Sequence, residues 1–306
     1  MRLATPRVRR ALASGALAAV ALTGCGAGDD AGAGGAASDR LVDPAKPPPL
    51  VNALDVDPAT GEFLLTTNRG FYRIDRESRE VTRVRGTVRA GTRSAPVGAF
   101  LEVAVARPGR LVGSGHPDRK GALPEYLGVM ASDDGGLRWR VLSRLGRADL
   151  HAIVFKHGRM YATDAVTGTL LVSRDGGRTF SEQYTPNGVP IDGFEVDPDD
   201  PRRIVAAGDF ELYRSANAGM VWERIGRGSG IRLAWPARGA LYRALKDGSV
   251  QRSSDGGTSW ATRGRVDGEP YRFKAMSRDE LYLALGDGTI LHTRDGARTW
   301  DEAFRP

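Results

Sequence analysis

A phrase of eight residues recurs five times in this chain, and it constrains the fold more than any other feature. Its fullest copy reads Ser173-Arg-Asp175-Gly-Gly-Arg-Thr179-Phe180. The copies begin at residues 132, 173, 215, 253 and 293, so neighbouring copies lie 38 to 42 residues apart. A fixed period of about 40 residues indicates a repeat architecture, in which each period is one supersecondary unit.

Each copy has the composition of a tight β-hairpin turn. An apolar or aromatic run precedes the phrase, and a Trp or Phe closes it in all five copies. The glycines supply the positive φ that a tight turn requires, and Asp and Ser side chains bond to the turn backbone. The closing aromatic ring is expected to bury beside the turn and to anchor it.

Four short strands surround each copy of the phrase. The repeat after residue 190 shows them at 191–196, 204–207, 210–214 and 222–225. Four strands in a period of about 40 residues are typical of a β-propeller blade. The sequence therefore predicts an all-β fold over residues 50–306, a single propeller of six four-stranded blades.

The first predicted blade, over residues 52–85, has lost the phrase. Ile74, Arg76, Ser78 and Val81 stand where the other blades have Ser, Asp, Gly and Trp. The sequence leaves two ways to close the ring. The first and sixth blades pack flush against each other, or a strand near Pro49 is exchanged between them.

An insertion separates the first blade from the second. Ile74 and Ser132 hold equivalent positions 58 residues apart, which exceeds the usual period. The excess lies within residues 85–130 and is expected to form loops, including 113–120 and 123–127. Because long loops often carry function, His116 is a candidate ligand-binding residue. The alternative is an exposed histidine that stabilises a turn.

The first 49 residues are predicted to lie outside the folded domain. Residues 1–24 combine arginines with an apolar stretch too short to span a membrane, as in an export signal. The signal ends in Leu22-Thr-Gly-Cys25, which resembles the lipobox of bacterial lipoproteins, where the cysteine is lipidated. Residues 25–49, rich in Gly, Ala and Pro, are expected to be a flexible tether. The expected location is the outer face of the bacterial cell membrane, after Sec or twin-arginine export.

Charge and residue content argue against several classes of function. The formal net charge is +7, but residues 1–24 contribute four arginines and no acids, so the remainder carries +3. This small excess gives no support for nucleic-acid binding. Cys25 is the only cysteine, so no internal disulfide is possible. The four histidines lack metal-ligand spacing and no glycine-rich phosphate loop is present, so neither a metal nor a cofactor is predicted.

Polar residues stand where the innermost strand of each blade begins, which is the expected mouth of the central channel. Glu102 and Asp192 are candidate acid and base carboxylates for glycoside hydrolysis. At the strand beginnings the candidate substrate-binding residues are His151, Arg232, Tyr271 and Arg272, and Asn52 completes the ring. His116, in the insertion, is a further candidate substrate-binding residue. Such a mixture suits a polar, hydroxyl-rich or anionic ligand. The alternative is that these residues are solvated ends of strands.

The repeated phrase resembles the Asp-box, also called the BNR repeat, with the pattern Ser-x-Asp-x-Gly-x-Thr-Trp. Asp-boxes occur in sialidases, xyloglucan-degrading propellers, sortilin-type receptors and photosystem assembly factors. In those families the box lies on the rim of a blade, away from the active face. The resemblance implies a structural role for the matching residues, which are Asp134, Asp175, Asn217, Asp255 and Asp295. The asparagine is a departure from the pattern.

The lipobox and the runs 114–117 and 149–152 make the chain similar to bacterial propeller lipoproteins labelled glycosylhydrolases or sialidase-like. That label follows the fold and does not establish a reaction. Sialidases also place an arginine in a Phe/Tyr-Arg-Ile-Pro motif, which Phe71-Tyr-Arg73-Ile74 imitates. Here Asp75 replaces the proline, and the stretch falls on the strand that leads into the first box. We therefore reject it as the sialidase motif.

These observations leave three hypotheses about function. The first is a non-catalytic extracytoplasmic binding or assembly module, a monomer that presents its channel face and the 85–130 insertion to a glycan or a protein. The second is a glycoside hydrolase that uses Glu102 and Asp192. The third is a surface spacer. An enzyme needs paired carboxylates across a pocket, at least one with a raised pKa, whereas a binding module needs only a shaped face.

Overall fold

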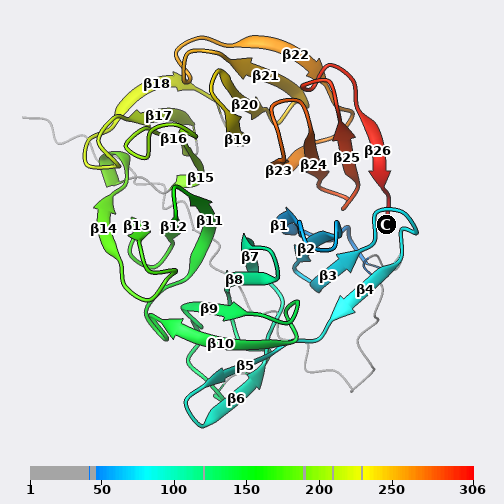
Figure 1. Ribbon diagram of the computed structural model, residues 1–306, viewed down its shortest axis with the longest axis vertical. Helices are drawn as coiled ribbons and strands as arrows, with labels where there is room; N and C mark the ends of the chain where they lie inside the picture. Colours follow the sequence, from blue (N-terminus) through cyan, green and yellow to red (C-terminus); the bar gives the residue numbers. More distant parts are fainter. Residues whose placement is uncertain (1–40, 42–45, 120, 189–190, 209, 229) are drawn as a thin grey trace, which may run out of the picture. The chain divides into compact units, whose positions relative to one another are not determined.

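Six β-sheets follow one another along the chain in the computed structural model of this protein (Figure 1). The structure describes residues 41, 46–119, 121–188, 191–208, 210–228 and 230–306, which belong to one unit of the chain, residues 38–306. The proposed signal peptide and Cys25 lie outside the described residues. No helix in the described ranges has the length and apolar character needed to span a membrane.

Five of the sheets are antiparallel and contain four consecutive strands each. The first is β1 (Val51–Val56), β2 (Phe63–Thr67), β3 (Gly70–Ile74) and β4 (Val81–Val84). The third is β11 (Leu150–Lys156), β12 (Arg159–Asp164), β13 (Thr169–Ser173) and β14 (Ser181–Tyr184), with the short 3₁₀ helix η1 (Pro186–Gly188) after it. The fourth is β15 (Ile191–Val196), β16 (Ile204–Gly208), β17 (Glu211–Ser215) and β18 (Glu223–Arg227).

The last two sheets repeat the same order. The fifth is β19 (Arg232–Ala237), β20 (Ala240–Ala244), β21 (Ser249–Ser253) and β22 (Ala261–Arg265). The sixth is β23 (Pro270–Ala275), β24 (Leu281–Leu285), β25 (Ile290–Thr293) and β26 (Asp301–Phe304). The innermost strands β1, β7, β11, β15, β19 and β23 each contact the next one around a ring, and β23 contacts β1. The predicted six-bladed propeller is therefore confirmed.

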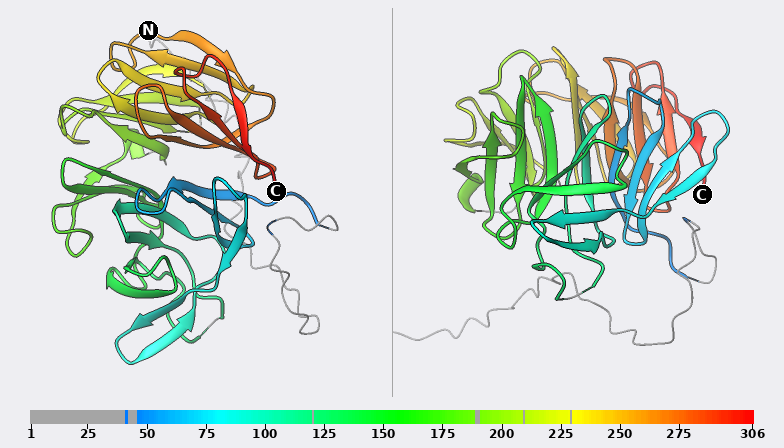
Figure 2. Two further views of the ribbon diagram at one scale, coloured as in Figure 1. Left: turned by 45° about the vertical axis from the view of Figure 1, so that its right-hand side comes forward. Right: turned by 60° about the horizontal axis from the view of Figure 1, so that its bottom comes forward.

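The second sheet has six strands and differs from the expectation of a loop insertion. Its order is β6-β5-β10-β9-β8-β7, so a hairpin lies outside the usual four strands (Figures 1 and 2). These strands are β5 (Thr87–Ala90), β6 (Arg93–Pro96), β7 (Glu102–Arg107), β8 (Arg110–Ser114), β9 (Val129–Ser132) and β10 (Arg138–Ser143). Gly113 and Ser114, expected in a loop, are instead the last two residues of strand β8. Both pair with residues of β7, and Gly113 also pairs with β9.

The ring closes by flush packing of the first and sixth blades, because each blade is built from its own consecutive strands. One buried cluster spans this seam, with Phe63 and Tyr282 edge to face at a centroid distance of 5.1 Å. Leu41 joins the same cluster with only 3% of its surface exposed. Arg69 donates a hydrogen bond to the carbonyl oxygen of Leu41. A residue of the segment expected to be a tether therefore covers the seam.

The repeated phrase forms a turn that satisfies its own polar groups. In the copy at 173–180, Asp175 Oδ1 accepts hydrogen bonds from Ser173 Oγ (2.8 Å) and from the backbone N–H of Thr179 (2.9 Å). Its Oδ2 accepts a hydrogen bond from Thr179 Oγ1 (2.6 Å). These bonds hold the pKa of Asp175 well below its usual range. The side-chain oxygen meets the first residue of the copy in the same way at Asp134, Asn217, Asp255 and Asp295.

Each of these turns joins the third strand of its blade to the fourth. Because the strands are antiparallel, the turn lies at the end opposite to the beginning of the innermost strand, where the channel mouth is expected. The turn also packs on the blade before it. Ser143 in the second blade donates a hydrogen bond (2.6 Å) to the carbonyl oxygen of Gly177 in the third. The phrase is therefore a joint between blades.

Gly136 shows why the second glycine of the phrase is needed. Its φ is +92°, and a Cβ there would lie 2.4 Å from Cε1 of Phe71 in the first blade. Trp139 donates from Nε1 to the carbonyl oxygen of Gly136 (2.8 Å) and is buried with Phe71 in one cluster. The closing aromatic residue and the glycine thus fix the same contact between two blades.

We predict that Gly136→Ala destabilises the protein by about 2–4 kcal/mol, because the left-handed backbone and the overpacked contact both add a cost. The matched control is Gly91→Ala in the β5–β6 turn, where φ is +61° and no heavy atom lies within 4 Å of the new Cβ. There we expect a cost of about 1–2 kcal/mol from the backbone alone. Urea unfolding of both variants measures the free energy of unfolding. Equal losses of stability would contradict the claim that the turn at Gly136 is packed tightly against the first blade.

Candidate functional site

A central channel runs between the innermost strands of the six blades. It encloses a cavity of about 330 Å³ lined by β1, β7, β11, β15, β19 and β23. We call the end where these strands begin the mouth and the end where they finish the far end. Charged residues line both ends, while the middle is lined by residues such as Val103, Ile153 and Leu233.

Irregular strand pairing directs several side chains to the mouth. The pairing of innermost strand with second strand skips one residue near the start of four blades. The skipped residues are Asn52, His151, Asp192 and Tyr271. An extra residue of this kind bends a strand and re-aims its side chain, and such bulges are frequent beside functional sites. Four of the seven polar residues expected at the mouth therefore share one backbone feature.

Glu102 begins β7 and lies among the other innermost strands at the mouth. Burial raises its pKa to about 8, although Arg272 and His151 favour the charged form. Its carboxyl group makes no hydrogen bond or ion pair with the part of the chain that the structure describes. At neutral pH the group is consequently a neutral acid that can donate a hydrogen bond or a proton into the cavity.

Asp149 connects two of the candidate histidines. Its Oδ2 lies 3.0 Å from Nε2 of His151 and 3.7 Å from Nε2 of His116. The other ring nitrogen of His116, Nδ1, lies 3.0 Å from the carbonyl oxygen of Glu125, and this contact holds the ring in place. The hydrogen bond that His151 donates to Asp149 raises the pKa of His151 and outweighs the opposing effect of burial, and the negative charge of Asp149 adds to the rise. The mouth therefore has a pair of histidines that share one acid.

Two arginines, Arg232 and Arg272, line the same cavity as Asp192. Burial lowers the pKa of Arg232, and the neighbouring Arg272 adds to this effect while Asp192 opposes it. The buried Nε of Arg232 has no hydrogen-bond partner among the described residues. Arg272 donates hydrogen bonds to the carbonyl oxygens of Asn52 and Tyr271, which carry no charge to balance it. A ligand with acceptor oxygens would supply further hydrogen-bond acceptors to the two guanidinium groups that line the cavity.

Tyr271 and His116 contribute differently from the expectation. Neither lines the cavity, whereas Glu102, His151, Asp192, Arg232 and Arg272 do. The ring of Tyr271 lies 6.0 Å from the Arg232 guanidinium and packs against the seam between the first and sixth blades. Tyr271 and His116 are therefore placed to position Arg232 and Asp149.

Two lysines close the far end of the channel. Lys274 in the sixth blade lies 2.6 Å from Oδ1 of Asp55 in the first blade, and Asp55 Oδ2 accepts from the backbone N–H of Val105 in the second. Burial alone would lower the pKa of Lys274, but the Asp55 carboxylate outweighs it and holds the pKa above its usual value. Lys156 in the third blade donates to Glu195 (3.1 Å).

Lys156 also donates to the backbone carbonyl oxygens of Val196 (2.9 Å) and Trp235, in the fourth and fifth blades. All three of its ammonium hydrogens are then used. The charges of both far-end lysines are therefore paired within the protein.

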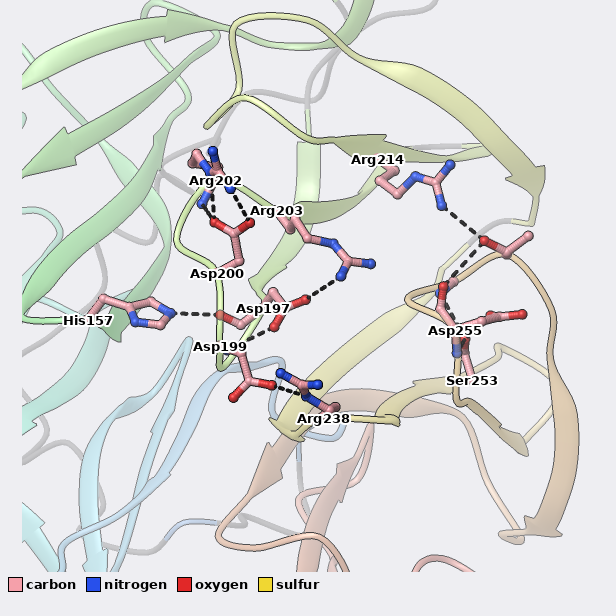
Figure 3. Close-up of polar contacts among 12 residues, drawn as sticks. His157, Asp197, Asp199, Asp200, Arg202, Arg203, Arg214, Arg238, Ser253 and Asp255 are labelled. Carbon is pink, nitrogen blue, oxygen red and sulfur yellow. Dashed lines mark hydrogen bonds and ion pairs between the residues drawn. The ribbon is translucent and has the colours of Figure 1, made fainter.

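The turns beyond the far end add further contacts between blades (Figure 3). His157 donates from Nε2 to the carbonyl oxygen of Asp197 (2.7 Å), whose carboxylate lies 3.3 Å from Arg203. Arg238 in the fifth blade donates to Asp199 in the fourth (2.6 Å). These contacts strengthen the scaffold around the closed end of the channel.

The structure also shows where other sequence features lie. Arg73, in the stretch that imitates a sialidase motif, forms an ion pair with Glu62 on the first blade and is not part of the cavity lining. Sequence reasoning missed Asp149, Lys156 and Lys274. A charged residue within an otherwise apolar innermost strand was the available signal for both lysines. No group of three or more His, Cys, Asp or Glu side chains in the described ranges could hold a metal ion.

Comparisons with known proteins support the fold. No protein-family model matches the chain, and no curated protein matches it. Among solved structures, YCF48 bound to D1 peptide has a TM-score of 0.53 at 13% identity, covering 80% of this chain and 93% of that one. Virginiamycin B lyase from Staphylococcus aureus has a TM-score of 0.52 at 13% identity, covering 83% of each chain.

The GH74 xyloglucanase from Xanthomonas campestris has a TM-score of 0.45 at 22% identity, covering 81% of this chain and 44% of the enzyme. The likeness to YCF48 and to virginiamycin B lyase agrees with the β-propeller architecture. At these identities the likeness concerns the fold alone.

We predict that Asp149→Asn lowers the pKa of His151, because the variant loses the acceptor that favours the charged ring. NMR titration of the histidine ring protons measures this, with His157 at the far end as internal reference. A raised folded pKa contributes stability that is present below the ordinary value of 6.5 and is lost as pH rises through the folded value. The Tm difference between the two proteins should therefore shrink from pH 5.5 to 8.5. An unchanged His151 titration would contradict the assignment.

Proposed function

We propose that this protein is an extracytoplasmic binding or assembly module that receives a polar ligand at the mouth of its channel. The observation that carries the proposal is the contrast between the two channel ends. The lysines of the far end have their charges paired, whereas the mouth presents Arg232 with an unpaired buried nitrogen and a neutral Glu102. Buried polar groups are normally paired, so an arginine with a buried nitrogen and a neutral acid that line one cavity support a ligand that binds beside them.

The ligand that fits this mouth is a glycan or a segment of an extracytoplasmic protein. Hydroxyl and carboxyl oxygens accept from the arginines, and hydroxyl hydrogens donate to Asp192. YCF48, a propeller of similar fold, has been solved with a peptide. We propose further that the domain is a monomer held at the outer face of the cell membrane by a lipid on Cys25. The lipobox-like run that ends at Cys25 supports this part.

A second candidate function is glycoside hydrolysis, and one observation favours it. With its pKa raised to about 8, Glu102 is protonated at neutral pH, as a general acid must be. Asp192 lines the same cavity and would be the second carboxylate. The two functions differ in what they require of Glu102. A hydrolase needs its proton, whereas a binding module needs only a neutral side chain of this shape.

Glu102→Gln therefore separates the two functions, because glutamine copies the neutral acid but cannot donate its proton. The mature chain carrying Cys25→Ser, which cannot be lipidated, is screened on a glycan array, a peptide library and aryl-glycosides that include sialosides. We predict binding that survives Glu102→Gln. We also expect Arg232→Gln to weaken it about 10- to 100-fold, the equivalent of one or two lost hydrogen bonds to a charged group.

Arg227→Gln on the outer strand β18 is the control, since that residue is exposed and lies outside the cavity lining. Turnover of a glycoside that disappears in Glu102→Gln would establish the hydrolase instead. Binding that is equally affected by Arg232→Gln and Arg227→Gln would place the ligand elsewhere. A glycan and peptide screen without any binding would remove the support for a ligand at the mouth.

A further inference from the structure

The second blade carries a positive net charge. Its six strands and their connections, residues 87–143, contain eight Lys and Arg against five Asp and Glu, a net charge of +3. Residues 25–306 together also carry +3, so the rest of the chain after the signal is neutral overall. The extra hairpin β5–β6 belongs to this blade.

The outer strands of this blade place arginines on one face. Strand β10 pairs in parallel with β5, so that Arg140 stands opposite Arg89 and Arg138 stands opposite Thr87. Between them Trp139 and Val88 face inward and are buried, which leaves the three arginines exposed. Neighbouring strands lie about 4.8 Å apart, and side chains on one face of a strand lie about 7 Å apart. We call this surface, with Ser94 on β6, the arginine face.

The arginine face keeps charges together that repel each other. Like charges directly opposite on paired strands are destabilising. Two acids lie at its border, but they balance it only in part. Asp134 lies 2.7 Å from Arg138, and Asp133 is 3.6 Å from Arg140 and 2.7 Å from Arg110 on β8. Arg89 donates to the backbone carbonyl oxygen of Gly91, an uncharged acceptor. The repulsion between these arginines would be relieved if a negatively charged partner bound to the arginine face.

We propose that the arginine face is a docking surface for an extended acidic segment of a partner protein. A groove of about 530 Å³ follows this face, lined by Arg89, Ser94, Arg138 and Arg140. An extended chain presents alternate side chains about 7 Å apart, which matches the spacing of Arg138 and Arg140. Guanidinium groups bind carboxylates through two parallel hydrogen bonds. The proposal is independent of any ligand at the channel mouth.

Two features favour a protein segment over other anionic partners. Asp133 and Asp134 also line the groove, so a uniformly anionic membrane surface would meet repulsion there, whereas a peptide can place uncharged residues against these two acids. Strand addition to β6 is disfavoured, because Pro96 has no N–H and its carbonyl oxygen accepts from the backbone N–H of Asp118. Recognition is therefore expected through side chains.

The test measures binding of a fluorescein-labelled peptide of twelve residues that alternates Glu and Ser. Fluorescence anisotropy is recorded at 50 and 300 mM NaCl with the mature, unlipidated chain. We expect binding at low salt that weakens at high salt, and a loss of at least tenfold in Arg89→Gln/Arg140→Gln. Because the opposed charges are removed, this variant should keep its Tm or gain a few degrees.

The matched control is Arg224→Gln/Arg227→Gln on β18, which removes the same charge from exposed positions of another outer strand. It should bind the peptide within twofold of the parent protein. Equal weakening by both double variants would show that only net charge matters and would overturn the proposal. Absence of binding at 50 mM NaCl would also overturn it. Binding to phosphatidylglycerol vesicles without binding to the peptide would assign the face to a membrane instead.

Discussion

The structure depends on two half-buried lysines that hold the innermost strands together at the far end of the channel. In a propeller without an exchanged strand, no shared sheet joins the last blade to the first. Here Lys274 and Asp55 connect the sixth blade to the first, and Asp55 continues to the backbone of the second. Lys156 connects the third, fourth and fifth blades.

Removing one partner of a fully buried ion pair generally costs about 3–5 kcal/mol, because an uncompensated charge remains. The Lys274 side chain keeps 33% of its surface exposed, so the cost here is smaller. The two lysines therefore connect the six blades in two groups of three. The turns of the repeated phrase also connect blades at the rim, because each turn packs on the blade before it.

The propeller and the position of its mouth could be predicted from the sequence, because both follow from the period of the phrase. Asp175 and its equivalents stand at fixed distances from their strands, so one copy defines the register of all. The hairpin β5–β6 could not be predicted, since residues 87–96 match no copy of the repeat and pair in parallel with a strand distant in sequence. The link from Asp149 to His116 was also hidden, because the loop that holds His116 has no counterpart in other blades.

The strand bulges explain why the mouth residues do not occupy equivalent positions along the six innermost strands. An extra residue before Arg272 shifts it relative to Glu102, and Tyr271 takes the bulge position that His151 occupies in the third blade. A bulge has no strong sequence signal when the extra residue is polar and exposed. Such local irregularity is typical of sites that aim side chains at a ligand.

The central claim is that the mouth holds an acid that the protein keeps neutral at physiological pH. A ¹³C NMR titration of the side-chain carboxyl groups tests it most directly, with Glu102→Gln used to identify the signal. Burial among the innermost strands predicts that Glu102 titrates near pH 8. A midpoint close to 4.5, the ordinary value for a glutamate, would mean that the mouth is open to water and that the contrast between the two channel ends does not exist.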